Sequence, residues 1–350
     1  MDLIYKGQAS GNVATALLNN GFNLNALRSW VGDDSKSYMT EMRGGKPDVV
    51  LAQNNATLRK DEWIELDRVV IGAAKERLRL VADLRAAGLT YNLPNGMGRT
   101  VLESQTMGDI TPAIISMDPT RQSEGDRPEF DLVGLPLPII HKDFKFNIRQ
   151  IATSRNGGTP IDTTTAALAG RRVAEMAEQL ALGTAGTISY GGGTVYGITN
   201  FPQRITSSLT DPTDSGWTPS VLVNEVLAMR QLSVNKFHYG PWVMYNSPGW
   251  DSYLDADYSE LKGDITLRER LQKINGVQDI RTLDHLTGLQ ILLVQQTTDV
   301  IREVIGMDIT TVQWESLGGL ELNFKVMAIL VPQIRADQNG NTGLVHGSVA

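Results

Sequence analysis

The stretch that decides the fold runs from Leu135 to Gly183 and opens with LPLPIIHKDFKFNIR, residues 135–149. At the end of this opening, apolar and polar side chains alternate strictly. One face carries Phe144, Phe146 and Ile148, and the other carries Lys145, Asn147 and Arg149. A period of two predicts a β-strand with one dry face.

The second half of the stretch changes to the period of a helix. Thr159, Pro160 and Asp162 supply a cap, a first-turn proline and a first-turn acid, and Gly183 provides a stop. We therefore expect a helix over 159–183. The stripe expected to be buried consists of Ala166, Ala169, Val173, Met176, Ala177 and Leu180.

Composition restricts the class of protein. The chain has 350 residues, of which 41% are hydrophobic, so it can bury a substantial core. It contains no cysteine, which excludes disulfides and thiol chemistry, and its net charge of −7 argues against a sequence reader of nucleic acid. An acidic surface can still enclose nucleic acid. No secretory signal follows Met1, and no run of about eighteen apolar residues predicts a membrane span.

The residues before the central stretch fall into three regions. Residues 1–56 are rich in asparagine and glycine, and predict an extended arm that orders against another surface, with an unstructured tail as the alternative. Residues 57–91 predict a long helix from Thr57 to Gly88. Its apolar positions are Trp63, Leu66, Val70, Ala73, Leu78, Val81 and Leu84.

Residues 92–134 predict a long two-stranded excursion. Its strands are expected at Thr111–Met117 and Phe130–Leu137, with a charged tip at 118–127. A ribbon so poor in apolar residues is not stable alone, so it requires a neighbouring surface. This requirement points to assembly.

The second half of the chain mixes helices and strands. We expect a hairpin at Ser189–Ile198, helices at Thr218–Leu232, Pro248–Tyr258 and Thr266–Ile274, strands at Pro241–Tyr245, Leu289–Val294, Val300–Ile305, Thr310–Trp314 and Leu320–Met327, and a polar tail at 336–350. The strand at 320–327 alternates like the strand at 144–148, so the two are expected to pair in antiparallel fashion. The fold class is α+β.

Four features resemble chemical sites, and each has a simpler interpretation. The glycine-rich run at 191–197 lacks the Gly-Lys-Ser/Thr ending of a phosphate loop, which favours a turn. The run that begins at Asp337 has Thr342 at the sixth position, where a calcium loop needs glycine, and Ser348 at the twelfth, where it needs an acid, which favours a flexible tail. Asp251, Asp255 and Asp257 lie close in sequence, but exposed carboxylates usually serve solvation.

The last feature is a set of four histidines, His141, His238, His285 and His346, which lie far apart in sequence, and no Gly-x-Ser-x-Gly elbow is present. We therefore assign no catalytic, cofactor-binding or metal-binding residue and no cofactor. The protein is expected not to be an enzyme. An enzyme whose site is dispersed along the chain remains the alternative from another class.

Three motifs resemble one known family. They are LPLPIIHKDF at 135–144 with the helix that contains RVAE at 172–175, LRKDEWIELD at 58–67, and YGPWVMY at 239–245 with Trp250–Leu254. Together they resemble the shell proteins of encapsulin nanocompartments and the major capsid proteins of tailed bacteriophages, which share the Hong Kong 97 capsid fold. The order of elements is similar from about residue 57 to 335.

The resemblance implies a division of the chain into named parts. These are an N-terminal arm (1–56), an N-terminal helix region (57–91), an E-loop (92–134), a P domain with its spine helix (135–216), an A domain (217–298), return strands of the P domain (299–335) and a C-terminal tail (336–350). No lysine or asparagine can be assigned a part in the covalent crosslinks that some capsids of this fold form.

The resemblance also implies a structural function. The subunit would assemble with itself into hexamers and pentamers of an icosahedral head that encloses double-stranded DNA. Scaffolding, portal and cement proteins would be further partners, with no membrane, and the protein would reside in the virion after assembly in the host cytoplasm. The arm and the polar tail favour a phage capsid, and the alternative is an encapsulin shell that holds cargo enzymes.

Overall fold

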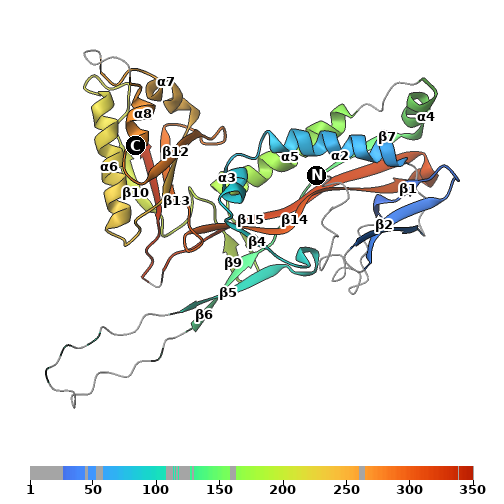
Figure 1. Ribbon diagram of the computed structural model, residues 1–350, viewed down its shortest axis with the longest axis horizontal. Helices are drawn as coiled ribbons and strands as arrows, with labels where there is room; N and C mark the ends of the chain where they lie inside the picture. Colours follow the sequence, from blue (N-terminus) through green and yellow to red (C-terminus); the bar gives the residue numbers. More distant parts are fainter. Residues whose placement is uncertain are drawn as a thin grey trace. The chain divides into compact units, whose positions relative to one another are not determined.

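The computed structural model describes residues 27–43, 46–52, 58–107, 113, 115, 117, 127, 130–157, 163–259, 265–337 and 339–349 (Figure 1). The chain forms two compact units. Unit 1 comprises Met1–Thr100, Leu137–Ala185 and Arg302–Pro332, and unit 2 comprises Val101–Pro136, Gly186–Ile301 and Gln333–Ala350. Within the described residues, no helix is both long and apolar enough to cross a membrane.

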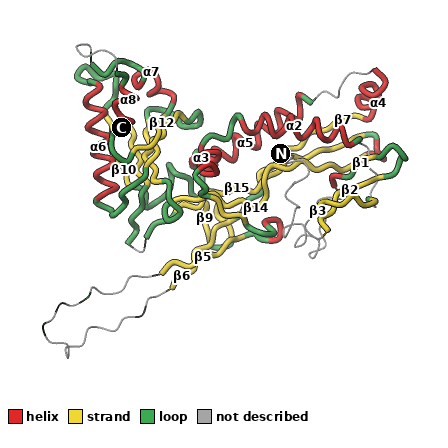
Figure 2. The backbone as a smooth tube through the Cα atoms, in the orientation of Figure 1, coloured by secondary structure: helices red, strands yellow, loops and turns green. Residues whose placement is uncertain are grey.

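Unit 1 is built on a four-stranded sheet with two long helices on one face (Figure 2). The strand order is β4 (Thr90–Asn92), β14 (Ile301–Ser316), β15 (Glu321–Ile334) and β7 (Ile140–Asn147). The helices are α2 (Lys60–Lys75) and α5 (Thr164–Leu182). The two strands expected at 300–305 and 310–314 are one continuous strand, β14, which a turn at η4 (Leu317–Gly319) connects to β15.

The pairing expected between the two alternating strands is confirmed. Strands β7 and β15 are antiparallel, and Phe144 lies directly opposite Phe324. Their rings stack at 5.1 Å between centroids with an interplanar angle of 11°, and both are buried. Phe146 and Trp63 contact Phe324 edge-on, so four aromatic rings join α2 to the sheet.

The strand ends earlier than its alternation suggests, so the placement of Ile148 and Arg149 on it is wrong. Both residues begin helix α4 (Ile148–Gly157). Asn147 accepts the backbone N–H of Arg149 at 2.9 Å, and its own N–H donates to the side chain of Gln150 at 3.0 Å. This reciprocal capping box starts a helix at the point where the apolar alternation would continue the strand.

The spine helix is confirmed at its C-terminal end. Helix α5 stops at Gly183, whose φ of 90° is left-handed. The expected start at 159–162 lies outside the described residues, and the described helix begins at Thr164. The apolar stripe is buried apart from Met176, which is 47% exposed and was wrongly placed in the core.

The helix expected from Thr57 to Gly88 is two helices. Thr57 lies outside the described residues, α2 ends at Lys75, and α3 (Leu80–Ala86) follows after a break. The break has a tertiary cause, because Glu178 of α5 accepts the backbone N–H groups of Leu80 and Val81 and so caps a new helix start.

The described part of the N-terminal arm is a small sheet. Its strands are β1 (Trp30–Val31), β2 (Ser37–Arg43) and β3 (Lys46–Leu51), in that order. Its entry docks on α2, since the indole of Trp63 donates to the carbonyl of Ser29 at 3.1 Å and Arg28 forms an ion pair with buried Asp67. Residues 27–31 therefore order against their own chain.

Unit 2 contains a five-stranded mixed sheet. The strand order is β10 (Ile205–Leu209), β16 (Leu344–Val349), β13 (Gln290–Gln295), β11 (Trp242–Asn246) and β12 (Val277–Thr282). Its helices are α6 (Pro219–Val234), α7 (Asp251–Leu254) after the 3-10 turn η3 (Pro248–Trp250), and α8 (Leu267–Gln272). The buried strands β11 and β13 and the helix that begins at Pro219 confirm the expectations for these segments.

The C-terminal segment contradicts the expectation of a flexible polar tail. Strand β16 lies between β10 and β13, and Leu344 and Val345 are buried. Asp337 fixes the turn that leads into it, because its carboxylate accepts the backbone N–H groups of Asn339 and Asn341 at 2.9 and 2.7 Å. The run that begins like a calcium loop is therefore a turn, in which the carboxylate of Asp337 binds backbone N–H groups.

Candidate functional site

The feature of unit 2 that demands an explanation is a two-stranded ribbon, here called the β5–β6 ribbon. It consists of β5 (Val101–Met107) and β6 (Phe130–Pro136), paired in antiparallel fashion from Val101 opposite Pro136 to Met107 opposite Phe130. The expected strand at Phe130–Leu137 is thereby confirmed. Its partner is Val101–Met107 and not Thr111–Met117. Most of Thr111–Met117, and all of the tip except Arg127, lies outside the described residues.

The ribbon is anchored at its base. At its base Leu102 and Leu135 are buried, and the hairpin of β8 (Ile188–Tyr190) and β9 (Gly193–Val195) packs against it. The contact is close, since a Cβ on Gly193 would lie 2.1 Å from the carbonyl oxygen of Gly134. The glycine-rich run is thus a hairpin turn, as expected, with Gly191 and Gly192 both at positive φ.

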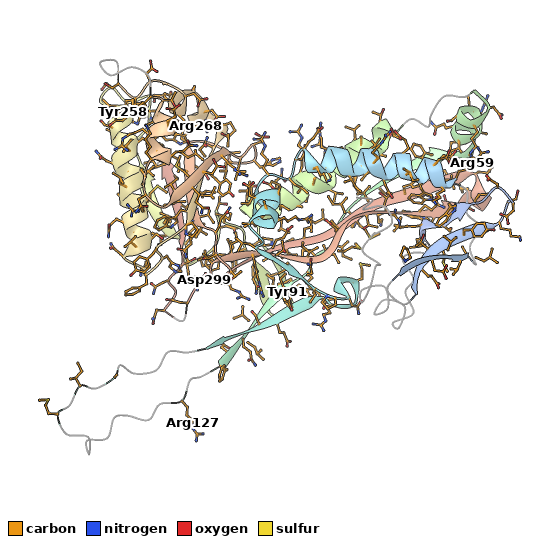
Figure 3. The ribbon with its side chains drawn as sticks, in the orientation of Figure 1. Arg59, Tyr91, Arg127, Tyr258, Arg268 and Asp299 are labelled. Atoms are coloured by element: carbon orange, nitrogen blue, oxygen red, sulfur yellow. The ribbon has the colours of Figure 1, made fainter. Side chains whose placement is uncertain are left out.

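Beyond its base the ribbon is exposed on both faces. Phe130, Leu132 and Val133 are 64%, 61% and 48% exposed, although alternation places Leu132 and Val133 on opposite faces. Arg127, labelled in Figure 3, is also exposed. A strand pair with two open faces and large apolar residues is not a stable element by itself, so its geometry suits a surface that another molecule covers.

Polar groups in the core of unit 1 hold elements together. Glu178 is 2% exposed, and its Oε1 accepts the N–H of Leu80 at 2.6 Å. Burial raises the pKa of Glu178 to about 7, although its backbone hydrogen bonds favour the charged form and only partly offset this effect. Glu178 therefore positions α3 on α5 and has no access to a substrate.

A second cluster in unit 1 joins α3 to strand β14. Arg85 donates to Glu303 at 2.9 Å and to Asp308 at 3.0 Å, and Glu303 is 2% exposed. Burial raises the pKa of Glu303, while the charge of Arg85 acts in the opposite direction. This network ties a helix to the sheet and, like Glu178, serves the fold.

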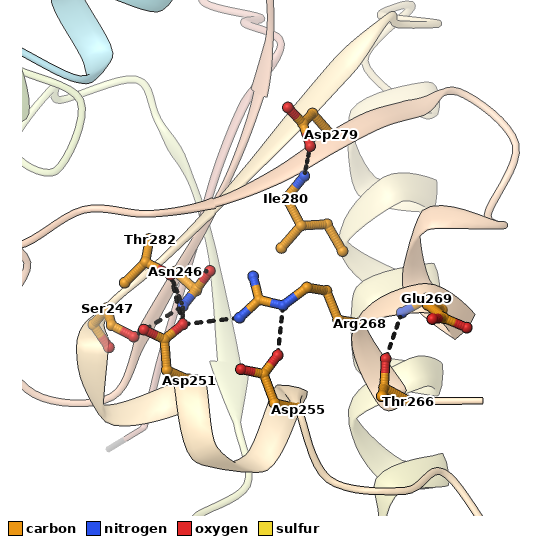
Figure 4. Close-up of polar contacts among 10 residues, drawn as sticks. All are labelled: Asn246, Ser247, Asp251, Asp255, Thr266, Arg268, Glu269, Asp279, Ile280 and Thr282. Carbon is orange, nitrogen blue, oxygen red and sulfur yellow. Dashed lines mark hydrogen bonds and ion pairs between the residues drawn. The ribbon is translucent and has the colours of Figure 1, made fainter. Parts of the chain in front are cut away.

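Two of the three acidic residues considered as a cation site, Asp251 and Asp255, are paired with an arginine (Figure 4), and the third, Asp257, is exposed. Arg268 donates to Asp251 at 3.0 Å and to Asp255 at 2.8 Å. Burial opposes ionisation of Asp251, but hydrogen bonds from Thr282, Arg268 and Asn246 outweigh it and lower its pKa. The cluster joins α7 and α8 to the ends of β11 and β12, and a guanidinium occupies the position that a cation would need.

The histidines are not gathered into a site. The ring of His346 accepts from Arg204 at Nδ1 (3.2 Å) and faces Gln290 at Nε2 (3.2 Å), so it is a neutral link between strands. Burial, followed by the charge of Arg204, lowers the pKa of His346 to about 4. Over the described ranges, no group of three or more histidine, aspartate or glutamate side chains is arranged to hold a metal ion.

Known proteins are similar to this chain in sequence or in fold. The type 1 encapsulin shell protein EncA of Myxococcus xanthus is 25% identical over 287 residues, which cover 79% of this chain and 90% of that protein. The virus-like particle of Pyrococcus furiosus is 17% identical with a TM-score of 0.55, covering 81% of this chain and 97% of the other. The capsid of Myoviridae phage XM1 is 7% identical with a TM-score of 0.57, covering 72% and 86%.

These matches confirm the expected fold, because capsids of phages and shells of encapsulins share the Hong Kong 97 architecture. A family model described as a family of unknown function, DUF6260, matches residues 52–347. The match includes most of both units and leaves out residues 1–51, which contain β1, β2 and β3, and the last three residues. The chain therefore belongs to the DUF6260 family and has the Hong Kong 97 capsid fold.

Proposed function

We propose that this protein is a structural subunit that assembles with copies of itself into a closed shell. The β5–β6 ribbon carries the proposal, since it exposes Phe130, Leu132 and Val133 on two open faces and requires a covering surface. The encapsulin relative, a shell protein, is similar over most of its length and supports this assignment. Function is then mechanical, and no catalytic residue is invoked.

The finer proposal is a major capsid protein of a tailed phage. Hexamers and pentamers of the subunit would form an icosahedral head around double-stranded DNA, assembled in the host cytoplasm with scaffolding, portal and cement proteins. The sheet of β1, β2 and β3 supports this version, because it lies before the first long helix, α2. An arm at this position favours a phage capsid over an encapsulin shell. The net charge of −7 suits a container that must not adhere to packed DNA.

The parts of the chain take the following proposed roles. Residues 92–134 are the E-loop that reaches a neighbouring subunit, 135–216 form the P domain with α5 as its spine, and 299–335 return to it. Residues 217–298 form the A domain. Its sheet also includes β10 and β16, so the segment 336–350 contributes a strand to the sheet and not a tail.

An encapsulin nanocompartment is the second candidate. The observation that favours it is the sequence similarity to EncA. In this case the shell would enclose cargo enzymes and not DNA. A soluble enzyme with a dispersed site, the third hypothesis, gains no support from the buried acids, which hold structural elements.

One experiment separates these functions. The full chain is expressed, particles are purified, and their contents are analysed for nuclease-protected DNA and for co-enclosed protein, with electron microscopy to count pentamers and hexamers. Portal and terminase genes beside the coding sequence would support the phage capsid, and a cargo-enzyme gene would support the encapsulin. Small compact particles alone under all assembly conditions would contradict both shell functions.

A further inference from the structure

Two bulky residues of this chain have a backbone conformation that normally suits glycine. Among the described residues, four non-glycine residues have positive φ: Ser35 (61°), Asn95 (61°), Phe237 (63°) and Leu317 (53°). The left-handed region crowds Cβ against the backbone, so glycine and small polar residues are usual there. Ser35 and Asn95 fit this preference, whereas Phe237 and Leu317 do not.

The subunit gains no burial from either side chain. Phe237 is 75% exposed and Leu317 is 72% exposed, and these are among the most exposed large apolar side chains of the described residues. An isolated subunit would be better served by glycine at both positions, because glycine removes the steric conflict and the exposed apolar surface. The identity of these residues therefore calls for a cause outside the chain.

The backbone at each position is fixed by ordinary turns. Phe237 follows α6, where its N–H donates to the carbonyl of Val234 at 3.0 Å and the N–H of His238 donates to that of Ser233 at 3.1 Å. This is a helix-ending turn in which glycine is the common residue. Leu317 opens the turn between β14 and β15.

Each residue has an exposed apolar neighbour in the sequence. Tyr239, two residues after Phe237, is 68% exposed, and Leu320, three residues after Leu317, is 63% exposed. Near the Leu317 turn, Glu315 is exposed and Glu321 forms an ion pair with Lys145 at 2.8 Å, so the turn has no excess of positive charge for nucleic acid. Next to Phe237 the single exposed Lys236 is flanked by the apolar surface of Phe237 and Tyr239. An apolar protein surface fits these positions better.

We propose that Phe237 and Leu317 are contact residues, each of which packs against a second copy of this chain. The proposal rests on the proposed shell function, in which every subunit is surrounded by identical copies. A few side chains that insert into well-packed pockets of a neighbouring surface contribute most of the energy of an interface. In the free subunit these two residues expose apolar surface and strain the backbone. Association with a second copy would offset both costs.

Glycine substitutions test the proposal, because they should affect folding and assembly in opposite ways. In Phe237→Gly and Leu317→Gly, the unfolding temperature of dissociated subunits should stay equal or rise by about 1–3 °C. The concentration needed for shell formation, followed by light scattering and electron microscopy, should rise at least about tenfold. Ser35→Gly is the matched control, since it relieves the same conformation at an exposed polar residue and should leave assembly unchanged.

Asparagine variants provide a second test. Phe237→Asn and Leu317→Asn keep a Cβ and tolerate positive φ, so they should assemble as poorly as the glycine variants. If the variants at one position form shells at the same concentration as the wild type, the proposal is overturned for that residue. This holds even if another protein binds at that position. If the wild-type chain itself forms no shells, the proposed function fails instead, so the two failures are distinguishable.

Discussion

At the scale of single residues, the core of unit 1 contains an acid whose charge is disfavoured. Glu178 is 2% exposed and faces the N-terminus of α3, and Asp83 of α3 adds a like charge. The neighbouring ion pairs of Arg171, Arg172 and Arg77 are made with Glu175, not with Glu178. Burial therefore dominates, and the pKa of Glu178 rises to about 7 from an ordinary value of 4.5.

This pKa predicts how stability depends on pH. Between pH 4.5 and 7 the unfolded chain releases the proton of Glu178 and the folded chain retains it, so this group lowers the free energy of unfolding as pH rises. The total loss is about 3 kcal/mol, at 1.4 kcal/mol per pKa unit. It is complete above pH 7, and the stabilisation is fully present below pH 4.5.

The substitution Glu178→Gln should remove this dependence. Urea unfolding of dissociated subunits from pH 4.5 to 7.5 should show the variant gaining stability relative to wild type as pH rises. The difference between the two proteins isolates Glu178, because all other titrating groups are common to both. Glu76→Gln, at an exposed position after α2, is the control. A constant difference across this range would contradict the raised pKa.

At the scale of elements, unit 1 depends on the crossing of α2 and α5. Gly170 lies at the contact, where a Cβ would stand 2.7 Å from the carbonyl oxygen of Val70 and 2.9 Å from its Cγ1. The helices can approach this closely only because residue 170 has no side chain. Gly72, in α2, has no atom within 4 Å of the corresponding position.

The two glycines should respond in opposite ways to alanine. Gly72→Ala should stabilise the subunit by about 1 kcal/mol, through helix propensity alone. Gly170→Ala should destabilise it by about 1–3 kcal/mol, because the clash with α2 exceeds the same gain in propensity. Thermal unfolding of both variants measures the contrast. Equal stabilisation by the two substitutions would mean that the helices are not in close contact.

The elements that the sequence predicts well are those whose signal is local. The alternation around Phe144 and Phe324 and the helix that ends at Gly183 follow from periodicity and stop signals. The elements it misses depend on distant partners. Helix α3 begins because Glu178, 98 residues further along, accepts the N–H of Leu80, and no local pattern encodes this.

The C-terminal strand shows the same limit. Leu344–Val349 follows a polar run and contains a histidine and a glycine, so its composition favours a tail. Its burial comes from pairing with β10 and β13, which lie far away in the sequence. For the candidate site, the apolar-poor composition of 92–134 predicts that the ribbon needs a covering surface. The composition does not predict that Val101–Met107 is the strand that pairs with β6.

At the scale of the whole molecule, unit 2 combines a well-packed core with a ribbon that is largely exposed beyond its base, where Gln333 donates to Ser104 at 3.5 Å. The core of unit 2 is extensive and includes Trp242, Trp250 and Leu293, all nearly inaccessible. That core contains no described residue of the β5–β6 ribbon, although Leu102 and Leu135 at the base of the ribbon are buried. Folding of the subunit and use of the ribbon should therefore be separable.

Deletion of residues 118–127 tests this separation. Because the deleted segment lies beyond Met107 and before Phe130, the pairing of β5 with β6 can remain, and the subunit should unfold at the wild-type temperature. Shell formation should fall strongly, since the ribbon could no longer cover a neighbouring subunit as proposed. Size-exclusion chromatography and electron microscopy measure assembly, and calorimetry measures folding.

A replacement variant distinguishes contacts from reach. If residues 118–127 are exchanged for ten glycine and serine residues, the length of the excursion is kept and its side chains are lost. Assembly of this variant with failure of the deletion would mean that length matters and the contacts lie elsewhere, for example at Phe130 and Leu132 on β6. Normal shells from the deletion itself would contradict a role of residues 118–127 in assembly, because no contact made by this tip could then be required.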